Sequence, residues 1–390
     1  MCAKLCICST IPVSIRAFYG PQIEYLLESG FELGIVTSPD ERFADELPEQ
    51  VRYLPVTMTR SLTPWRDLQA LCRLIRFFRK NRFDLVQYNT PKAALLCSIA
   101  SLLSRVPVRL YLMWGLYYTG RTGWKRSFFK LFERIICRLS THIAPDGNET
   151  RTFAIRERLC PAGKIEVVGN GSANGIDLGR FDRCKLAAAR HEIRASFNLE
   201  ESHVVVGTVA RLGREKGINE LVRGFAAAYN DRPLLRLLLV GPREMRNVDS
   251  LDADVQRLIE QHSAVVTTGF RQDVERYMAA MDIFTLPSWR EGFGVVNLEA
   301  AAMELPVIST DVMGPRESVM DGVSGILVAV RDPAALAATI LALTDDPERR
   351  RRLGCAGRRR VEQEFEQRAH WRKILEHRYR ILQGNRAVRS

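Results

Sequence analysis

Two glutamates, Glu291 and Glu299, bracket a turn that contains Gly292 and Gly294. The turn follows an apolar run over residues 282–287, which is typical of a buried strand, and leads into an alanine-rich helix. Glycines let the backbone approach a ligand closely, and a helix start offers N–H groups and a positive dipole end to an anion. Carboxylates accept hydrogen bonds from sugar hydroxyls. The segment therefore predicts a site for a ligand with phosphate and hydroxyl groups; an ordinary turn with surface glutamates is the alternative.

A second charged loop follows a predicted strand over residues 204–209. Arg211, Lys216 and Gly217 lie in this loop, and a helix is predicted from Asn219. Open α/β sheets bind ligands at the carboxyl ends of their strands, where Arg211 and Lys216 can converge on a diphosphate. The spacing alone also fits a surface loop. Two such loops within one predicted domain favour a binding site.

Strands and helices alternate along the whole chain of 390 residues, which predicts two doubly wound α/β domains with parallel sheets. The strands are predicted over residues 4–10, 32–38, 51–56, 84–88, 108–112 and 165–168, and then over 204–209, 235–240, 265–268, 282–286, 306–309 and 326–328. The helices predicted in the first half span residues 22–29, 66–80, 91–103 and 124–139. The segment 169–177 is rich in glycine and asparagine and is a candidate hinge. We expect one domain over 1–172, a second over 173–365, and a C-terminal helix over 366–390 that returns to the first.

The composition is ordinary for a globular protein, with 46% hydrophobic and 26% charged residues. No apolar run approaches the roughly 18 residues that span a bilayer, and the first residues do not form a secretory leader. The nine cysteines form no CxxC pair, and Cys72, Cys97 and Cys137 fall in apolar segments. This pattern predicts buried thiols in a reducing compartment, and hence a cytoplasmic protein.

The positive charge is concentrated in one part of the chain. Residues 66–138 contain 15 basic and 3 acidic residues, a net charge of +12 that equals the net charge of the whole chain. Two helices predicted within this block, over 66–82 and 124–139, also carry aromatic residues. Such a block favours a polyanionic partner, either nucleic acid or an anionic membrane surface. The alternative is that the aromatic residues face the core and the arginines face solvent.

Several motifs resemble those of the retaining glycosyltransferases of family 4, which have the GT-B fold. They are Gly207-Thr208-Val209-Ala210-Arg211-Leu212 with Lys216-Gly217, then Thr268-Gly269-Phe270, then Glu291-Gly292-Phe293-Gly294 with Glu299. The resemblance is dense in the C-terminal half; in the N-terminal half it depends on Thr90-Pro91-Lys92-Ala93 and Gly169-Asn170-Gly171. It implies two Rossmann-like domains that face a central cleft, with the C-terminal helix crossing back to the N-terminal domain.

The resemblance also implies roles for individual residues. Arg211 and Lys216 would bind the donor diphosphate, Glu299 the ribose hydroxyls, and Glu291 the transferred sugar. The remaining predicted substrate-binding residues are Gly292, Phe293, Gly294, Val295, Gly269, Phe270 and Trp114. No cofactor and no metal are expected, because such enzymes generally use none and Asp252-Ala253-Asp254 lies in a helical stretch.

The sequence departs from the family pattern after the strand predicted over 108–112. Many relatives have a His-Gly pair there, whereas this chain has Met113-Trp114-Gly115. Trp114 cannot exchange protons as an imidazole does, although its ring can pack against a sugar face. Gln87 and Asn89 also stand where some relatives have histidines. This pattern fits a front-side displacement in which the leaving phosphate accepts the proton of the acceptor.

The resemblance implies transfer of a sugar from a nucleotide-diphosphate sugar, with UDP favoured over GDP, to an acceptor hydroxyl. The favoured acceptor is a polyprenyl-diphosphate-linked glycan of bacterial capsule, exopolysaccharide or O-antigen synthesis, and the basic helices would hold the protein on the inner face of the cell membrane. The alternatives are a GT-B nucleotide-sugar isomerase, a transferase for a small soluble acceptor, and a non-catalytic module that binds sugar nucleotides. A nucleic-acid-binding protein is disfavoured because no known nucleic-acid motif is present.

Overall fold

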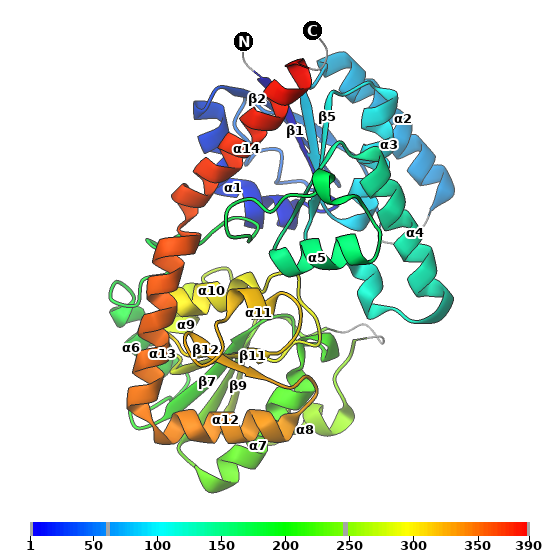
Figure 1. Cartoon of the computed structure of the whole chain (residues 1–390). Helices are drawn as coiled ribbons and strands as arrows, with labels where there is room; N and C mark the ends of the chain where they lie inside the picture. The colour runs from blue at the N-terminus through cyan, green and yellow to red at the C-terminus, as the bar shows by residue number, and fades with distance from the viewer. Residues whose placement is uncertain (1–2, 60–62, 245–248, 388–390) are drawn as a thin grey trace. The chain divides into compact units, whose positions relative to one another are not determined.

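The computed structural model describes residues 3–59, 63–244 and 249–387, and the chain divides into two compact units (Figure 1). Unit 1 comprises Met1–Asn174 and Ala369–Ser390, and unit 2 comprises Gly175–Arg368. Each unit contains one six-stranded sheet in which every strand pairing is parallel. Both sheets have helices on their two faces, so the predicted doubly wound α/β class is confirmed.

Unit 1 has the strand order β3-β2-β1-β4-β5-β6. Strands β2 and β3 are added in sequence on one side of β1, and β4 begins a second series on its other side, so the strand order reverses between β1 and β4. Its strands are β1 (Ala3–Cys8), β2 (Phe31–Thr37), β3 (Arg52–Pro55), β4 (Leu85–Tyr88), β5 (Val108–Met113) and β6 (His142–Pro145). Its helices are α1 (Pro12–Glu28), α2 (Pro64–Asn81), α3 (Pro91–Leu103), η1 (Tyr117–Gly120), α4 (Gly123–Leu139), α5 (Asn148–Arg156), η2 (Ala162–Lys164) and most of α14 (Gln367–Ala387).

The two faces of this sheet have separate hydrophobic cores. Helices α2, α3 and α4 cover one face, where Phe78 and Ile136 are buried. Helices α1 and α14 cover the other face and lie side by side in Figure 1. The Trp371 Nε1 of α14 donates a hydrogen bond to Asn174 Oδ1 over 2.6 Å, and the Trp371 ring contacts the Tyr25 ring of α1. The C-terminal helix is thus part of the packing of unit 1.

Three expectations for unit 1 are wrong. Helix α1 begins at Pro12 rather than at residue 22, because the helix continues through Pro21, which sequence rules treat as a breaker. Residues 165–168 form a loop with one isolated bridge, and the sheet ends instead with the short strand β6. Cys72 is exposed, since the buried face of α2 is defined by Ala70, Leu74 and Phe78.

Unit 2 has the strand order β12-β11-β10-β7-β8-β9, which reverses direction between β7 and β10. Its strands are β7 (Val204–Val209), β8 (Leu235–Val240), β9 (Val265–Gly269), β10 (Ile283–Leu286), β11 (Val307–Thr310) and β12 (Gly325–Val328). Its helices are α6 (Ala187–Ser196), η3 (Arg214–Lys216), α7 (Ile218–Asp231), α8 (Ala253–Gln261), α9 (Val274–Ala279), α10 (Val295–Ala302), α11 (Pro315–Ser318), α12 (Pro333–Asp345), α13 (Pro347–Arg360) and η4 (Val361–Phe365).

The faces of the second sheet are covered by different helices. Helices α7, α8 and α12 bury one face, and α6, α9 and α10 bury the other. All six strands predicted from the apolar runs of this half are present, with bounds that shift by one residue at most. Across the described ranges of both units, no helix combines the length and the apolar character needed to cross a bilayer.

Candidate active site

The strand order of unit 2 reverses between β7 and β10, so the loops that follow these strands diverge toward opposite faces of the sheet. Open α/β sheets bind ligands in the crevice at this position. The loop after β7 supplies Lys216, and the loop after β10 supplies Glu291. The Nζ of Lys216 donates a hydrogen bond to the Oε1 of Glu291. The structure thereby brings together two of the three predicted catalytic residues.

The carboxylate of Glu291 is also held by a residue that the sequence analysis did not single out. The Oγ of the buried Ser288 donates a hydrogen bond to Glu291 Oε1 over 2.7 Å. The hydroxyl of Thr310, at the end of β11, donates to the carbonyl oxygen of Ser288 and fixes the loop to the neighbouring strand. The sequence signal for Ser288 was its place directly after the apolar strand.

Backbone and side-chain contacts join the two loops. The Trp289 amide donates to the Glu215 carbonyl over 3.0 Å, and the Trp289 Nε1 donates to Glu220 Oε1 over 3.1 Å. Gly217 has a φ of 69°, and a Cβ at this position would lie 1.9 Å from the carbonyl oxygen of Pro287. Only glycine fits there. The close approach that positions Lys216 therefore depends on the glycine that follows it.

The glycine-rich turn places the start of α10 beside Glu291. Gly294 precedes the helix with a φ of 76°, and Val295 is the first helical residue. The side chain of Phe293 is buried against Phe365, with 5.7 Å between the ring centroids, so this residue can offer a ligand only its backbone. The first N–H groups of α10 and the positive end of its dipole lie next to the turn, as an anion site requires.

Glu299 lies in the second turn of α10 and is partly exposed. Burial of the carboxyl among neighbouring atoms raises its pKa to about 7, an effect that Arg180 opposes and Glu275 reinforces. Arg180 and Glu275 form an ion pair of 2.7 Å. Glu299 therefore gains or loses its proton near neutral pH.

Arg211 is not brought to Glu291. Its Nη1 donates to Glu244 Oε2 over 2.6 Å and lies 3.9 Å from Asp249 Oδ2, and its side chain is 50% exposed. Asp249 also accepts a hydrogen bond from the Glu215 amide over 2.6 Å, so it shapes the loop that carries Lys216. Glu244 and Asp249 were not predicted from the sequence, because acidic residues after β8 carry no specific local signal.

Two further predicted residues lie at the end of the edge strand β9: Gly269 is its last residue and Phe270 follows it. The carbonyl oxygen of Gly269 accepts a hydrogen bond from the Gly241 amide over 3.0 Å, which joins the loops after β8 and β9. The Phe270 side chain is 67% exposed at this carboxyl edge. An exposed ring in this place can stack on a flat ligand ring.

The segment Asp252-Ala253-Asp254 begins helix α8, with Asp252 at the N-cap. Arg223 pairs with both carboxylates, at 2.7 Å from Asp252 and 2.9 Å from Asp254. Among the residues that the structure describes, no group of three or more His, Cys, Asp and Glu side chains is arranged to hold a metal ion.

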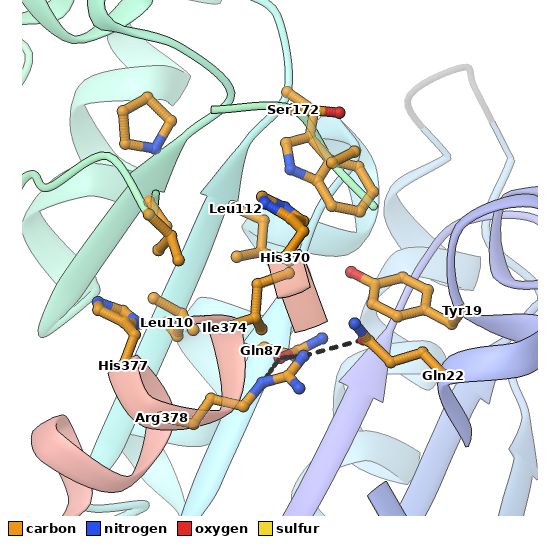
Figure 2. Close-up of a pocket in the computed structure, with 15 residues that line it drawn as sticks. Tyr19, Gln22, Gln87, Leu110, Leu112, Ser172, His370, Ile374, His377 and Arg378 are labelled. Carbon is orange, nitrogen blue, oxygen red and sulfur yellow. Dashed lines mark hydrogen bonds between the residues drawn. The ribbon is translucent and has the colours of Figure 1, made fainter. Parts of the chain in front are cut away.

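Trp114, the remaining predicted substrate-binding residue, belongs to unit 1 and follows β5. Its ring stacks on Tyr19, with 5.7 Å between the ring centroids and 25° between the planes, and it lies 5.0 Å from the Phe18 ring. It also lines a cavity of about 30 Å³ between the sheet and helices α1 and α14 (Figure 2). The role of Trp114 at a sugar face stays a prediction.

The most polar feature of this cavity is the guanidinium of Arg378 on α14, which is 2% exposed. It donates to Gln87 Oε1 over 2.9 Å and to Gln22 Oε1 over 3.3 Å, as the dashed lines in Figure 2 show. Burial lowers the pKa of Arg378 to about 10, so the group remains charged at neutral pH. Burial also lowers the pKa of His370 and His377 to about 4, so both are neutral there.

Comparisons with known proteins agree with this arrangement. A family described as "Glycosyl transferases group 1" matches residues 203–346, and one described as "Glycosyl transferase 4-like domain" matches residues 18–171. The chain is 32% identical over 367 residues to the capsular polysaccharide biosynthesis glycosyltransferase CapM of Staphylococcus aureus, with 94% of each chain covered. It is 26% identical to the UDP-Gal:alpha-D-GlcNAc-diphosphoundecaprenol alpha-1,3-galactosyltransferase of Escherichia coli, with 83% of each chain covered.

Solved structures share the fold at lower identity. The glycosyltransferase from Rickettsia africae has a TM-score of 0.80 at 19% identity and covers 97% of this chain and 98% of its own. Anabaena Alr3699/HepE in complex with UDP and glucose has a TM-score of 0.77 at 19% identity and covers 96% of this chain and 99% of its own. At such identities the likeness establishes the architecture alone.

Proposed function

The chain belongs to the group 1, GT4-like family of retaining glycosyltransferases with the GT-B fold, and from this premise we propose that it transfers a hexose from UDP to a hydroxyl of a polyprenyl-diphosphate-linked glycan. The main support is the contact between Lys216 and Glu291 at the point where the strand order of unit 2 reverses. A cation and a carboxylate in contact there match a ligand that carries a diphosphate next to a sugar.

Lys216 would act on the leaving group. As the glycosidic bond breaks, negative charge grows on the nucleoside diphosphate, and a fixed ammonium stabilises this transition state more than the ground state. The first N–H groups of α10 would add to this effect. Arg211 is half exposed and paired with Glu244, so it can exchange that carboxylate for the diphosphate.

Glu291 would act on the transferred sugar. With Lys216 drawn to the diphosphate, the carboxylate accepts hydrogen bonds from sugar hydroxyls while Ser288 keeps its orientation. In a front-side displacement the leaving phosphate oxygen takes the proton of the acceptor hydroxyl, and the acceptor oxygen bonds to the anomeric carbon on the face that the phosphate leaves. This course preserves the anomeric configuration. Glu299 would accept hydrogen bonds from the ribose, and the exposed ring of Phe270 would contact the base.

The proposed donor and acceptor are supported by the name of one relative and by surface features of unit 1. The name of the Escherichia coli relative specifies UDP-Gal and a diphosphoundecaprenol-linked acceptor. In unit 1, the basic helices α2 and α4 expose Trp65 and Trp124, which are 78% and 72% accessible. Exposed tryptophans beside lysines and arginines are typical of proteins that lie on an anionic membrane surface. A peripheral position at the membrane would give access to a lipid-linked acceptor.

The deciding experiment measures transfer and nucleotide binding in the same protein preparations. A panel of UDP- and GDP-hexoses is assayed with a polyprenyl-diphosphate-linked glycan for the wild type, Glu291→Ala, and the exposed control Glu348→Ala. We expect Glu291→Ala to lower the transfer rate by about 10³-fold and to leave UDP affinity within about threefold, with no change in the control. Wild-type turnover in Glu291→Ala would contradict the sugar-subsite assignment.

The same assay separates the alternatives. Product that forms without an acceptor would indicate an isomerase, and transfer to a water-soluble glycan alone would indicate a soluble acceptor. Nucleotide preference is read independently from the melting temperature with UDP and GDP, because a ligand that binds the native state raises it. Sedimentation with anionic liposomes at low and high salt tests the membrane position. Protein that remains in the supernatant at low salt would count against it.

A further inference from the structure

An apolar groove of about 320 Å³ lies between α3 and α4 of unit 1. Eight of the residues that line it are apolar or aromatic: Pro91, Leu95, Tyr117, Trp124, Phe128, Phe129, Phe132 and Ile136. Its volume falls at the lower end of the roughly 300–1,000 Å³ that is usual for pockets that bind small ligands. A helix or a second copy of the chain would need a contact area on the order of 1,000 Å² or more, so the groove fits one narrow apolar chain better.

Three aromatic side chains of α4, those of Trp124, Phe128 and Phe132, line the groove. Trp124, Phe128 and Phe132 follow one another at intervals of four residues on α4, which places them along one side of the helix. The rings of Phe128 and Phe132 lie 4.6 Å apart, and Tyr117 meets Phe129 edge to face at 5.0 Å. All three phenylalanines of this helix are only partly buried, so a ligand can still bury part of their surface.

Cations surround one end of the groove. Helix α3 begins directly after β4, and α4 begins shortly after β5, so both helix starts lie at the carboxyl edge of the sheet. Lys92 and Lys125 line the groove at these starts; the Lys92 Nζ is paired with Asp67 Oδ2 at 2.5 Å and its side chain is 9% exposed, whereas Lys125 is exposed. The guanidinium of Arg121 lies 4.7 Å from the centroid of the Tyr117 ring, and the Lys125 Nζ lies 5.9 Å from that of Trp124. The groove therefore combines a cationic end with an aromatic interior.

The floor of the groove carries one acid, Glu133, which is 3% exposed. The Tyr111 hydroxyl donates a hydrogen bond to Glu133 Oε2 over 2.9 Å. Burial raises the pKa of Glu133 to about 7, so a large fraction of this group is uncharged near neutral pH. An apolar chain can lie over such a floor at a lower electrostatic cost than over a fully charged carboxylate.

Resting on the function proposed above, we propose that this groove binds the first isoprene units of the polyprenyl-diphosphate-linked acceptor, with the diphosphate facing Arg121 and Lys125. Charge and polarity match at both ends, because a polyprenyl diphosphate joins an anionic head to a single apolar chain. The groove would thus select the lipid part of the acceptor at the carboxyl edge of the sheet.

A series of prenyl diphosphates tests this assignment without the complete acceptor or a donor. Dimethylallyl, geranyl and farnesyl diphosphates share one head group, so differences in their affinity for the full-length protein report the chain alone. We expect affinity to rise at least about tenfold from dimethylallyl to farnesyl in the wild type, because apolar surface is buried. Leu95→Trp, which fills the groove from α3, should abolish this rise, and Leu131→Trp should preserve it.

Leu131 is a matched control because it lies on α4, is 52% exposed, and does not line the groove. Phe128→Ala, which removes part of the lining, should also weaken the rise and serves as the second variant if Leu95→Trp does not fold. An affinity that is independent of chain length in the wild type, or equal rises in Leu95→Trp and Leu131→Trp, would overturn the proposal.

Two further measurements exclude other occupants. Alkyl diphosphates of matched length should bind less tightly than farnesyl diphosphate; equal affinity would indicate a site for any lipid chain and overturn the isoprenoid assignment. Binding to anionic vesicles should be equal in Leu95→Trp and Leu131→Trp, and its selective loss in Leu95→Trp would identify the groove as a general bilayer contact. Because these assays involve no transfer, their failure is distinguishable from a failure of the proposed activity.

Discussion

The two sheets carry different chemistry at equivalent positions. Where the strand order of unit 2 reverses, the loops after β7 and β10 bring together an ammonium and a carboxylate, Lys216 and Glu291. Where the order of unit 1 reverses, the residues after β1 and β4 bring together two hydroxyls, since Thr10 Oγ1 lies 2.7 Å from Thr90 Oγ1. The same topology therefore presents a charged pair in one unit and a neutral pair in the other.

The hydroxyl groups of the neutral pair, Thr10 and Thr90, also accept hydrogen bonds from nearby backbone amides. The Thr10 amide donates to Thr90 Oγ1 over 3.1 Å, and the Ala93 amide donates to Thr10 Oγ1 over 3.3 Å. Thr90 has a φ of 58°, a strained value for a β-branched residue that only a well-packed surrounding maintains. A fold that is used twice can thus keep the proposed donor diphosphate site at the strand reversal of one unit, while the other unit also places cations at the α3–α4 groove and on α14.

The largest expected effect comes from the charged pair. Lys216→Met should lower kcat/KM by about 10²–10³-fold, because it removes a cation placed where negative charge develops. Arg211→Met should cost only about tenfold, since Arg211 is half exposed and has its own partner, Glu244. Steady-state kinetics with a saturating acceptor measure both. Equal losses in the two variants would contradict the distinction between these cations.

The two buried histidines of unit 1 should make its stability sensitive to acid. The pKa values of His370 and His377 in folded unit 1 are about 4, below the usual value near 6.5. The unfolded chain therefore takes up protons first, so stability is complete above about pH 6.5 and falls as the pH drops toward 4. We expect a loss of roughly 2 kcal/mol per histidine between pH 7.5 and 5.0. The raised pKa values of Glu133 in unit 1 and Glu299 in unit 2, both about 7, act oppositely: each contribution is present at low pH and is lost as the pH rises through 7.

Hydrogen exchange during urea unfolding can follow each unit separately. His370→Gln should reduce the acid sensitivity of unit 1, whereas the exposed His191→Gln in unit 2 should leave it unchanged. If both units lost stability in parallel in the wild type and in His370→Gln, burial of this histidine would not be the cause.

A moderate effect is expected at the ribose end of the donor site. UDP affinity should increase as the pH rises through about 7, because a deprotonated Glu299 accepts hydrogen bonds from both ribose hydroxyls. Glu299→Gln should bind UDP about tenfold more weakly and without this pH dependence. Calorimetric titration between pH 5.5 and 8.5 provides the measurement. A pH profile that persists in Glu299→Gln would assign the titration to another group.

The smallest effect is expected from the neutral pair. Thr10→Val keeps the shape of the side chain but removes the hydroxyl that contacts Thr90, and should cost about 1 kcal/mol of unfolding free energy. UDP affinity and kcat should stay within about twofold of the wild type, as denaturant titration and kinetics can establish. A large loss of transfer in Thr10→Val, at unchanged stability, would show that the unit 1 pair takes part in the reaction.

The sequence alone determined the strands of unit 2 and the two loops that carry Lys216 and Glu291. Apolar runs that end in glycine-containing turns are local patterns, and a parallel sheet brings the carboxyl ends of its strands to one edge whatever the remaining contacts are. The family pattern and the place of Glu299 on a helix followed from the same local signals. The role of Glu291 as the sugar-facing residue remains a prediction that kinetics will test.

Only the tertiary structure decided which partners these residues have. Ser288 orients Glu291 and Glu244 holds Arg211, contacts that depend on loop geometry rather than on spacing. Arg378 reaches Gln87 across 291 positions of sequence, which no local pattern encodes. Such long-range pairs depend on which elements pack against one another, because a buried polar group is hydrogen-bonded to whichever partner the tertiary fold places beside it. Likewise, the sequence did not decide whether the aromatic residues of α4 face the core. In the structure they line an open groove.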